Sequence, residues 1–166
     1  SGTGLVSPSV VSLSSGALGG TNVVTVNSLM NWTGGTMTGG GRTVISAGAT
    51  LNVANPAQVI VQTRTLENGG TVLWTGAGNL TLTSGGVITN RAGGLFHVQG
   101  PASFSAGGFE RGRIDNAGTF RKSANTATTA TGGGMSFNNF GTVDIRSGIL
   151  AASGGYTSTS GALLNC

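Results

Sequence analysis

The sequence has few charged residues, few aromatic residues and little proline. Of its 166 residues, 7% are charged, 5% are aromatic and only 3 are proline, whereas an average soluble domain is about 25% charged. Disordered chains combine low hydrophobicity with a high net charge, but this chain is 37% hydrophobic and has a mean hydropathy of +0.18. We therefore expect residues 1–166 to form one ordered domain with a hydrophobic core.

Cysteine and long apolar runs are also scarce. The single cysteine, Cys166, is the last residue, so the fold cannot depend on a disulfide bond within the chain. No apolar run approaches the length that spans a membrane, and the sequence does not begin with a basic segment followed by an apolar one. We expect no insertion into a membrane, and a chain that is either a secreted protein without its leader or a piece of a longer protein.

The charge balance is basic but rests on few groups. Eight basic residues oppose four acidic ones, which gives a net charge of +4 and a pI of about 10.7. Nucleic-acid-binding proteins usually show a dense basic stripe with stacking aromatic residues, so we expect no nucleic-acid partner. The only basic cluster consists of Arg111, Arg113, Arg121 and Lys122. Two interpretations stay open: solvated charges on a loop, or a contact with an anion or an acidic sugar.

Glycine is abundant, with 32 residues, and it recurs within a repeated phrase. Each copy starts and ends with an apolar residue, and the five copies begin at Ile45, Leu66, Ile88, Ile114 and Phe137. A second phrase contains Trp32 and Trp74, whose separation is twice the interval between the first two of these starts. Intervals of about 21 to about 26 residues between short β-type segments are typical of a solenoid.

Helix is disfavoured because the stretches without glycine are rich in β-branched residues, serine and asparagine. The sequence predicts an all-β fold, a single parallel β-helix of about seven rungs with 21–26 residues per rung and no significant α-helix. Its connections should be right-handed, by a strong general rule. Residues 31–155 are the expected repeat body and residues 156–166 its C-terminal end. Residues 1–30 form either an N-terminal cap or a strand donated to a neighbouring molecule.

An asparagine follows the first apolar position in four of the five copies: Asn68, Asn90, Asn116 and Asn139. Because small residues come next, the pattern predicts turns with positive φ and Asx-type hydrogen bonds. Asparagines stacked on successive rungs can also bond side chain to side chain, so we interpret the four as a structural ladder. The alignment predicts that Ile45 shares an inward-facing column with Leu66. It also predicts that Leu95 shares a second one with Val72.

Candidates for catalysis or metal binding are few. The single histidine, His97, has no serine, cysteine or carboxylate at a recognisable spacing, and too few ligating residues are present for a metal site. Glu67 and Asp115 fall in one column two rungs apart, hence about 10 Å from each other. That distance is near the upper limit for an inverting carboxylate pair. We predict no catalytic, cofactor-binding or metal-binding residues, and no cofactor.

The phrases at residues 31–39, 66–72 and 137–143 resemble repeats of large secreted bacterial β-solenoid proteins, the haemagglutinin-like and autotransporter-passenger-like surface proteins. The resemblance covers roughly residues 29–155. It implies a secreted or cell-surface location and a non-catalytic structural or adhesive role. No catalytic residues carry over, because the repeats themselves contain none.

A β-helix ends in unpaired backbone edges, and few charges guard them here. We therefore expect copies of the chain to associate end to end into an extracellular fibre, with surface polysaccharide as a further partner. Two alternatives stay open. A carbohydrate- or ice-binding module would use a regular threonine face, for which Thr36–Thr38 and Thr81–Thr83 are candidates. A polysaccharide lyase or hydrolase would need charged groups that converge in a cleft.

Overall fold

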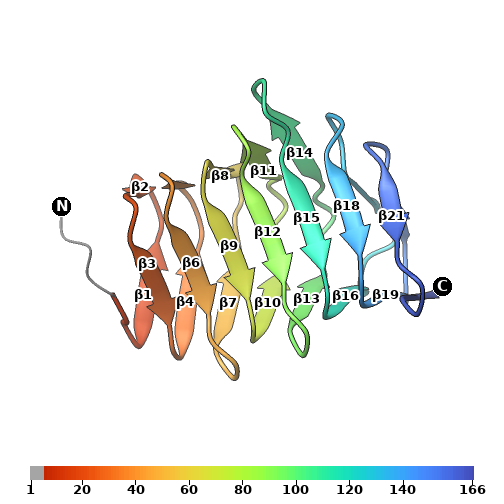
Figure 1. The fold of residues 1–166 in the computed structure, drawn as a ribbon, viewed down its shortest axis with the longest axis horizontal. Coiled ribbons are helices and arrows are strands. Elements are labelled where there is room, and N and C mark those ends of the chain that lie inside the picture. The colour runs from red at the N-terminus through yellow and green to blue at the C-terminus, as the bar shows by residue number, and fades with distance from the viewer. Residues whose placement is uncertain (1–5) are drawn as a thin grey trace.

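The computed structural model describes residues 6–166, and this part of the chain is a parallel β-helix (Figure 1). Its 22 strands form three main sheets around one core, and the described residues contain no α-helix. Each turn contributes one strand to each sheet, so strands three apart in the sequence are neighbours in a sheet. The prediction of an all-β parallel solenoid is confirmed.

Sheet 1 consists of β1 (Val10–Leu13), β4 (Leu29–Trp32), β7 (Thr50–Val53), β10 (Thr71–Trp74), β13 (Leu95–Val98), β16 (Thr119–Lys122), β19 (Thr142–Ile145) and β22 (Leu163–Asn165). Sheet 2 consists of β2 (Ala17–Leu18), β5 (Thr36–Thr38), β8 (Val59–Gln62), β11 (Leu80–Thr83) and β14 (Phe104–Gly107). A single bridge links sheet 2 to a further pair, β17 (Thr128–Ala130) and β20 (Ile149–Ala151). Sheet 3 consists of β3 (Val23–Val26), β6 (Arg42–Ile45), β9 (Thr65–Asn68), β12 (Val87–Asn90), β15 (Arg113–Asn116), β18 (Ser136–Asn139) and β21 (Tyr156–Ser158).

One outward-facing column of sheet 1 shows the length of each turn. Its members are Val10, Leu29, Thr50, Thr71, Leu95, Thr119, Thr142 and Leu163. The interval is shortest between the first two members and longest between Thr71 and Thr119, in the middle of the coil. The chain therefore makes the predicted seven turns of roughly 22 residues.

Apolar side chains fill the interior because inward and outward positions alternate along each strand. In sheet 1 one fully buried column consists of Met30, Leu51, Val72, Phe96, Phe120 and Val143. The rings of Phe96 and Phe120 stack with centroids 5.5 Å apart. Trp32 and Trp74 share another column with one residue between them, so their predicted two-rung separation is confirmed. Each large apolar side chain buried in this way stabilises the coil by about 1.5–3 kcal/mol.

The first copy of the repeat is shifted by two residues from its predicted alignment. Ile45 pairs with Asn68, and Thr43 occupies the column of Leu66. The cause is the corner between sheets 3 and 1, which has four residues at 46–49 but two at 69–70. Since Ile45 has no amide group, the asparagine column begins at Asn68.

The copy that begins at Ile88 also has a longer corner. Four residues, 91–94, separate β12 from β13. Leu95 therefore pairs with Thr71 on the outer face, and Phe96 takes the inward position beside Val72. The prediction that Leu95 lies in this inward column is wrong by one residue.

Glycine is required at these corners for two different reasons. In the two-residue corners, Gly70 and Gly118 do not have a positive φ, so that prediction is wrong. A Cβ atom there would instead collide with the carbonyl oxygens of Ala49 and Gly94 in the preceding turn. In a four-residue corner, Gly93 has a φ of 82°, and a Cβ would meet nothing within 4 Å. Close stacking thus selects glycine at Gly70 and Gly118, and left-handed backbone selects it at Gly93.

The N-terminal segment belongs to the coil. β1 pairs with β4 along its whole length, and Val6 pairs with Val24 of β3 through a single bridge. Residues 10–26 thus form the first turn and do not leave the body as a donated strand. Residues 1–5 lie outside the described part of the chain.

Candidate functional site

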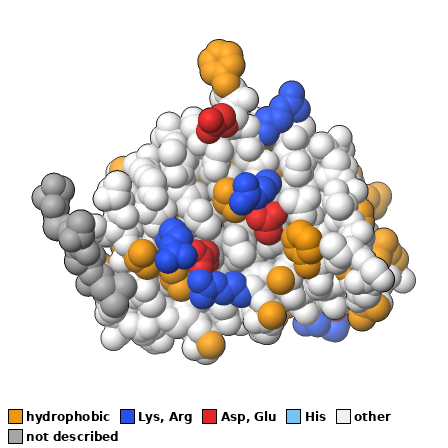
Figure 2. All heavy atoms as spheres, viewed as in Figure 1, with side chains coloured by type: hydrophobic (Ala, Val, Ile, Leu, Met, Phe, Trp, Pro, Cys, Tyr) orange, Lys and Arg blue, Asp and Glu red, His pale blue; other side chains and the backbone are white. Residues whose placement is uncertain are grey.

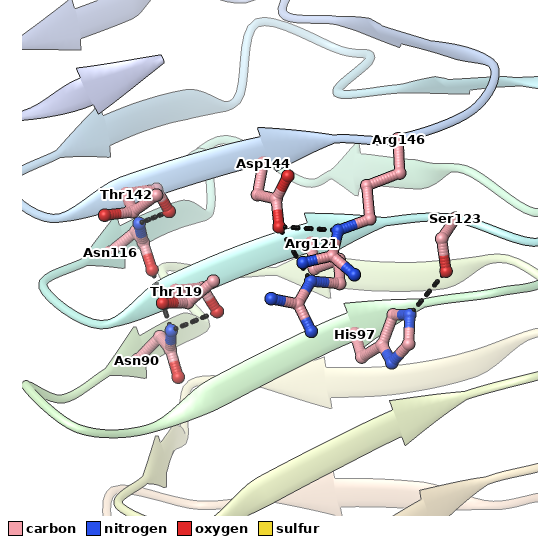
Figure 3. A network of polar contacts seen from close by, with 9 residues as sticks. All are labelled: Asn90, His97, Asn116, Thr119, Arg121, Ser123, Thr142, Asp144 and Arg146. Carbon is pink, nitrogen blue, oxygen red and sulfur yellow. Dashed lines mark hydrogen bonds and ion pairs between the residues drawn. The ribbon is translucent and has the colours of Figure 1, made fainter. Parts of the chain in front are cut away.

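The four predicted asparagines lie one above the other, inside the corner between sheets 3 and 1. All four are fully buried. Each Nδ2 donates to Oδ1 of the next rung: Asn68 to Asn90 at 2.8 Å, Asn90 to Asn116 at 2.7 Å and Asn116 to Asn139 at 2.8 Å. Asn90 also donates to the carbonyl oxygen of Thr119 at 3.1 Å (Figure 3). Because these buried amides are hydrogen-bonded, the ladder holds the turns together.

The ladder also shapes the corners and the last turn. Asn68 and Asn139 each accept a bond at Oδ1 from the main-chain N–H two residues later, at 3.1 and 3.3 Å. These are the predicted Asx-type bonds. At the end of the ladder, Asn139 donates to the hydroxyl oxygen of Tyr156 at 3.2 Å and to the carbonyl oxygen of Leu163 at 3.3 Å.

Arg64 is a buried cation that sequence reasoning missed. It lies between β8 and β9 and is 1% exposed. Its guanidinium donates, over 2.9–3.2 Å, to the hydroxyl of Thr43 and to the carbonyl oxygens of Gly20, Asn22, Thr38 and Arg42. Burial lowers the pKa of Arg64. None of these partners is a carboxylate, so main-chain dipoles and one hydroxyl compensate the charge, and the side chain ties three successive turns together.

Lys122 is a second buried cation, and its prediction as a surface anion contact is wrong. Its side chain faces inward, in the column of Val98 and Ile145, and is fully buried. Nζ has no hydrogen-bond partner among residues 6–166. Burial lowers the pKa of Lys122. The strand alternation contained this information, because Phe120 faces inward and Lys122 lies two residues later.

The other three residues of the predicted anion contact lie on separate surfaces. Arg113 is on the outer face of sheet 3, where its Nε donates to Asp115 at 2.8 Å. Arg121 is on the outer face of sheet 1, and Arg111 is exposed between β14 and β15. On the face drawn in Figure 2, basic and acidic side chains form small mixed groups rather than one basic patch. The structure does not bring the four predicted residues together.

Glu67 and Asp115 occupy one column of sheet 3 with Thr89 between them, as predicted. Glu67 lies between two arginines: Oε1 accepts from Arg42 at 2.7 Å, and Oε2 pairs with Arg91. We call these three residues the Glu67 triad. Asp115 accepts hydrogen bonds from side chains of its own strand and of the next one. Both carboxylates are thus engaged in local pairs.

A second carboxylate lies between two arginines on the outer face of sheet 1 (Figure 3). Asp144 Oδ2 accepts from Nε of Arg121 at 2.8 Å and from Nε of Arg146 at 3.0 Å. The hydrogen bond from Arg121 is the largest cause of the lowered pKa of Asp144, and burial opposes it. Nearby, His97 Nε2 lies 2.7 Å from the hydroxyl oxygen of Ser123. We call these five residues the sheet 1 cluster.

His97 is half-buried on this outer face, and its environment lowers its pKa. Burial is the largest cause of its lowered pKa, the charges of Arg121 and Arg146 act in the same direction, and Asp144 opposes them. Catalytic Ser–His pairs need a third group that orients the imidazole. Within residues 6–166, Asp144 bonds to the arginines and not to His97, so the pair with Ser123 is not such a triad.

The two Thr-x-Thr segments lie on the outer face of sheet 2, two turns apart. Ile60 and Gln62 occupy the turn between them, so the threonine ranks are interrupted. The hydroxyl oxygen of Thr81 lies 2.6 Å from that of Ser105 and also accepts from Gln58 at 2.6 Å. This hydroxyl is bonded within the protein rather than presented to a ligand.

The C-terminal end of the coil is open and apolar. β20, β21 and β22 are the last strands on their sides, and no strand of the described chain pairs with their outer edges. Between them lies a hollow of about 330 Å³, lined mainly by aliphatic side chains and by Tyr156 and Cys166. Leu163 is 56% exposed and Leu164 is 59% exposed. The end therefore presents core-type side chains to water.

Comparison with protein-family models, with curated proteins and with solved structures returned no match. Within residues 6–166, no group of three or more histidine, cysteine, aspartate or glutamate side chains could hold a metal ion. The same residues contain no helix that is long and apolar enough to cross a membrane. The open end and the sheet 1 cluster are the two features on which the proposals below rest.

Proposed function

We propose that this chain is a non-catalytic structural or adhesive solenoid of the extracellular space or cell surface, whose copies associate end to end. The observation that carries the proposal is the apolar end formed by β20, β21 and β22. Exposed apolar patches and unpaired strand edges favour association, because burial of apolar surface is worth about 25 cal/mol per Å².

The proposed occupant of this end is the first turn of a second copy. In sheet 1, β1 is the first strand and β22 the last, and each pairs along one edge only within the described residues. A second copy stacked in the same direction continues the strands in parallel. Such a contact is heterologous and leaves a new open end, so repeated stacking builds a fibre.

The columns of sheet 1 specify which residues meet across this contact. Extension of the pairing by one turn brings Leu163 next to Val10 of the following copy, and Leu164 next to its Val11. Leu164 is 59% exposed in the single chain and continues the inward column of Val143, so the contact covers an apolar side chain that now faces water. The last and first turns, measured along this column of sheet 1, are of similar length, so their outlines are similar in size.

Light scattering and electron microscopy across protein concentration, under reducing conditions, test the association. We expect the mass to rise with concentration and the fibres to be one coil wide. Leu164→Lys places a charge in the apolar end and should keep the protein monomeric. Thr119→Lys, on the outer face in the middle of the coil, is the matched control. A wild-type protein that stays monomeric at high concentration overturns the proposal.

A disulfide trap tests the direction and the pairing of the copies. Cys166 follows β22 at the position that Ile145 holds one turn earlier, so stacking brings it next to Leu13 of the following copy. Paired parallel strands are about 4.8 Å apart, a separation that a disulfide bond can bridge. Oxidised Leu13→Cys should give a ladder of linear multimers. Equal yields from Thr119→Cys would contradict the proposed pairing.

A further inference from the structure

We propose that the sheet 1 cluster is a binding site for a carboxylated polysaccharide, formed by the terminal guanidinium nitrogens of Arg121 and Arg146 together with His97 and Ser123. The cluster lies on the side of the coil, on β13, β16 and the residues around β19 (Figure 3). It does not depend on the open end, so this inference is independent of end-to-end association.

The donors of the cluster are only partly used. Arg121 and Arg146 each donate a hydrogen bond from Nε only, and both bonds go to the same oxygen, Oδ2 of Asp144. Within residues 6–166, no hydrogen bond involves the two terminal nitrogens of either guanidinium. A guanidinium can bind a carboxylate through two parallel N–H groups. The terminal nitrogens of both Arg121 and Arg146 remain available for such a bond.

The Glu67 triad has the same composition but a different geometry. Its carboxylate uses both oxygens, one for each arginine, and the bonds come from the terminal nitrogens of Arg42 and Arg91. Those nitrogens are thus already engaged with a carboxylate of the chain itself. The two clusters contain the same charges in different arrangements: the Glu67 triad uses one terminal nitrogen of each arginine, whereas the Asp144 arrangement uses none.

Charge and exposure favour an anion at the sheet 1 cluster. Two arginines and one aspartate give a net charge of +1, and the Arg146 side chain is 58% exposed. Asp144 is only 14% exposed and lies below the arginines as a support. Because one carboxylate orients both guanidinium groups, less side-chain entropy is lost when an anion binds.

The shape of the surface favours a polymer over a small molecule. His97, Arg121 and Asp144 are neighbours in one column on three successive strands. At about 4.8 Å per strand, the column extends about 10 Å along the coil axis. Small-molecule sites are usually concave pockets, whereas these side chains stand on the outer face of a sheet. An extended chain of sugar acids can follow such a column.

Binding should also change the protonation of His97. The charged groups that face it are Arg121, Arg146 and Asp144, and on its other side β10 presents the uncharged Leu73. Burial and the two arginines lower its pKa in the free protein. A bound carboxylate adds a negative charge nearby, favours the imidazolium and raises the pKa of His97.

The test is titration calorimetry at low salt, in which a short polygalacturonate oligomer is added to the full chain. Galacturonate monomer and a neutral dextran oligomer are the two comparison ligands. We expect binding of polygalacturonate that weakens with salt, much weaker binding of the monomer and none of dextran. Arg146→Gln should weaken polygalacturonate binding about tenfold or more, because a charge-assisted hydrogen bond is lost. Arg91→Gln, an arginine of similar exposure in the Glu67 triad, should change it less than about twofold.

Nuclear magnetic resonance supplies a second readout. The chain has a single histidine, so its imidazole signals belong to His97 without ambiguity. A pH titration should give a higher pKa for His97 with polygalacturonate than without it, and no difference with dextran. The proposal is overturned if Arg91→Gln weakens binding as much as Arg146→Gln, if the signals of His97 do not respond, or if no oligomer binds at low salt.

Discussion

Asn90 Nδ2 donates a hydrogen bond to Asn116 Oδ1 over 2.7 Å, although 26 residues separate the two in the sequence. Both side chains are fully buried, and each also bonds to main-chain carbonyl oxygens of the adjacent turns. In this setting the amides polarise one another and are shielded from water. The ladder therefore gives the corner between sheets 3 and 1 a stability that glycine-rich backbone alone would lack.

Asn116→Ala should lower the free energy of unfolding by about 2–4 kcal/mol, because the neighbouring amides lose a buried partner. Urea unfolding followed by circular dichroism measures the change. Asn138→Ala removes an amide on the outer face that bonds only to Asp115, and it should cost less than about 1 kcal/mol. Equal losses for the two variants would contradict a structural role for the ladder.

Arg64→Met should destabilise the N-terminal half of the coil by about 2–4 kcal/mol, because five oxygen atoms lose their donor. Hydrogen exchange should show faster opening of β3 and β6 than of β15 and β18. Arg111→Met removes an exposed arginine and should leave both stability and exchange unchanged. Hydrogen exchange that becomes faster by the same factor along the whole coil would argue against a local role for Arg64.

Lys122→Met should stabilise the protein by about 1–3 kcal/mol at neutral pH, because a buried amine without a partner is replaced by an apolar chain of similar shape. Thermal unfolding measures the effect as a rise in Tm. A lower Tm for the methionine variant would show that the amine has a stabilising contact.

Lys122 should also make stability depend on pH. Since folding lowers its pKa below the ordinary value of 10.5, the unfolded chain binds more protons between the lowered pKa and that value. The free energy of unfolding therefore rises with pH across this window. The difference between wild type and Lys122→Met should shrink as the pH rises, and a constant difference would contradict a charged Lys122 as the cause.

Gly118→Ala and Gly93→Ala should differ strongly in their effect. A Cβ at position 118 would collide with carbonyl oxygens of the preceding turn. A Cβ at position 93 would lie in open space, so alanine there costs only the strain of a positive φ. We expect a loss of about 1 kcal/mol for Gly93→Ala and at least about 3 kcal/mol for Gly118→Ala. Urea unfolding of both proteins decides the matter. Similar losses would show that close stacking is not what selects glycine at position 118.

Much of the fold could be read from periodicity. The spacing between Trp32 and Trp74 and the recurring asparagines predicted parallel turns of nearly constant length, because only stacked turns bring such residues into one column. The positions of Ile45 and Leu95 were predicted wrongly. Corners of two and of four residues follow one another without a fixed order or a clear mark in the sequence, and a shift of one residue moves a side chain to the opposite face.

The sequence by itself determined the coil, its number of turns and its asparagine ladder, because local β propensity and a regular period act through neighbouring turns alone. Only the tertiary structure decided which atoms each charged group meets. The guanidinium of Arg64 lies inside against carbonyl oxygens of two other turns, and Arg146 joins Arg121 of the preceding turn through Asp144. The physical reason is that a buried charge is compensated by the atoms that stacking brings within hydrogen-bond distance. Which atoms these are depends on the exact length of every corner along the chain.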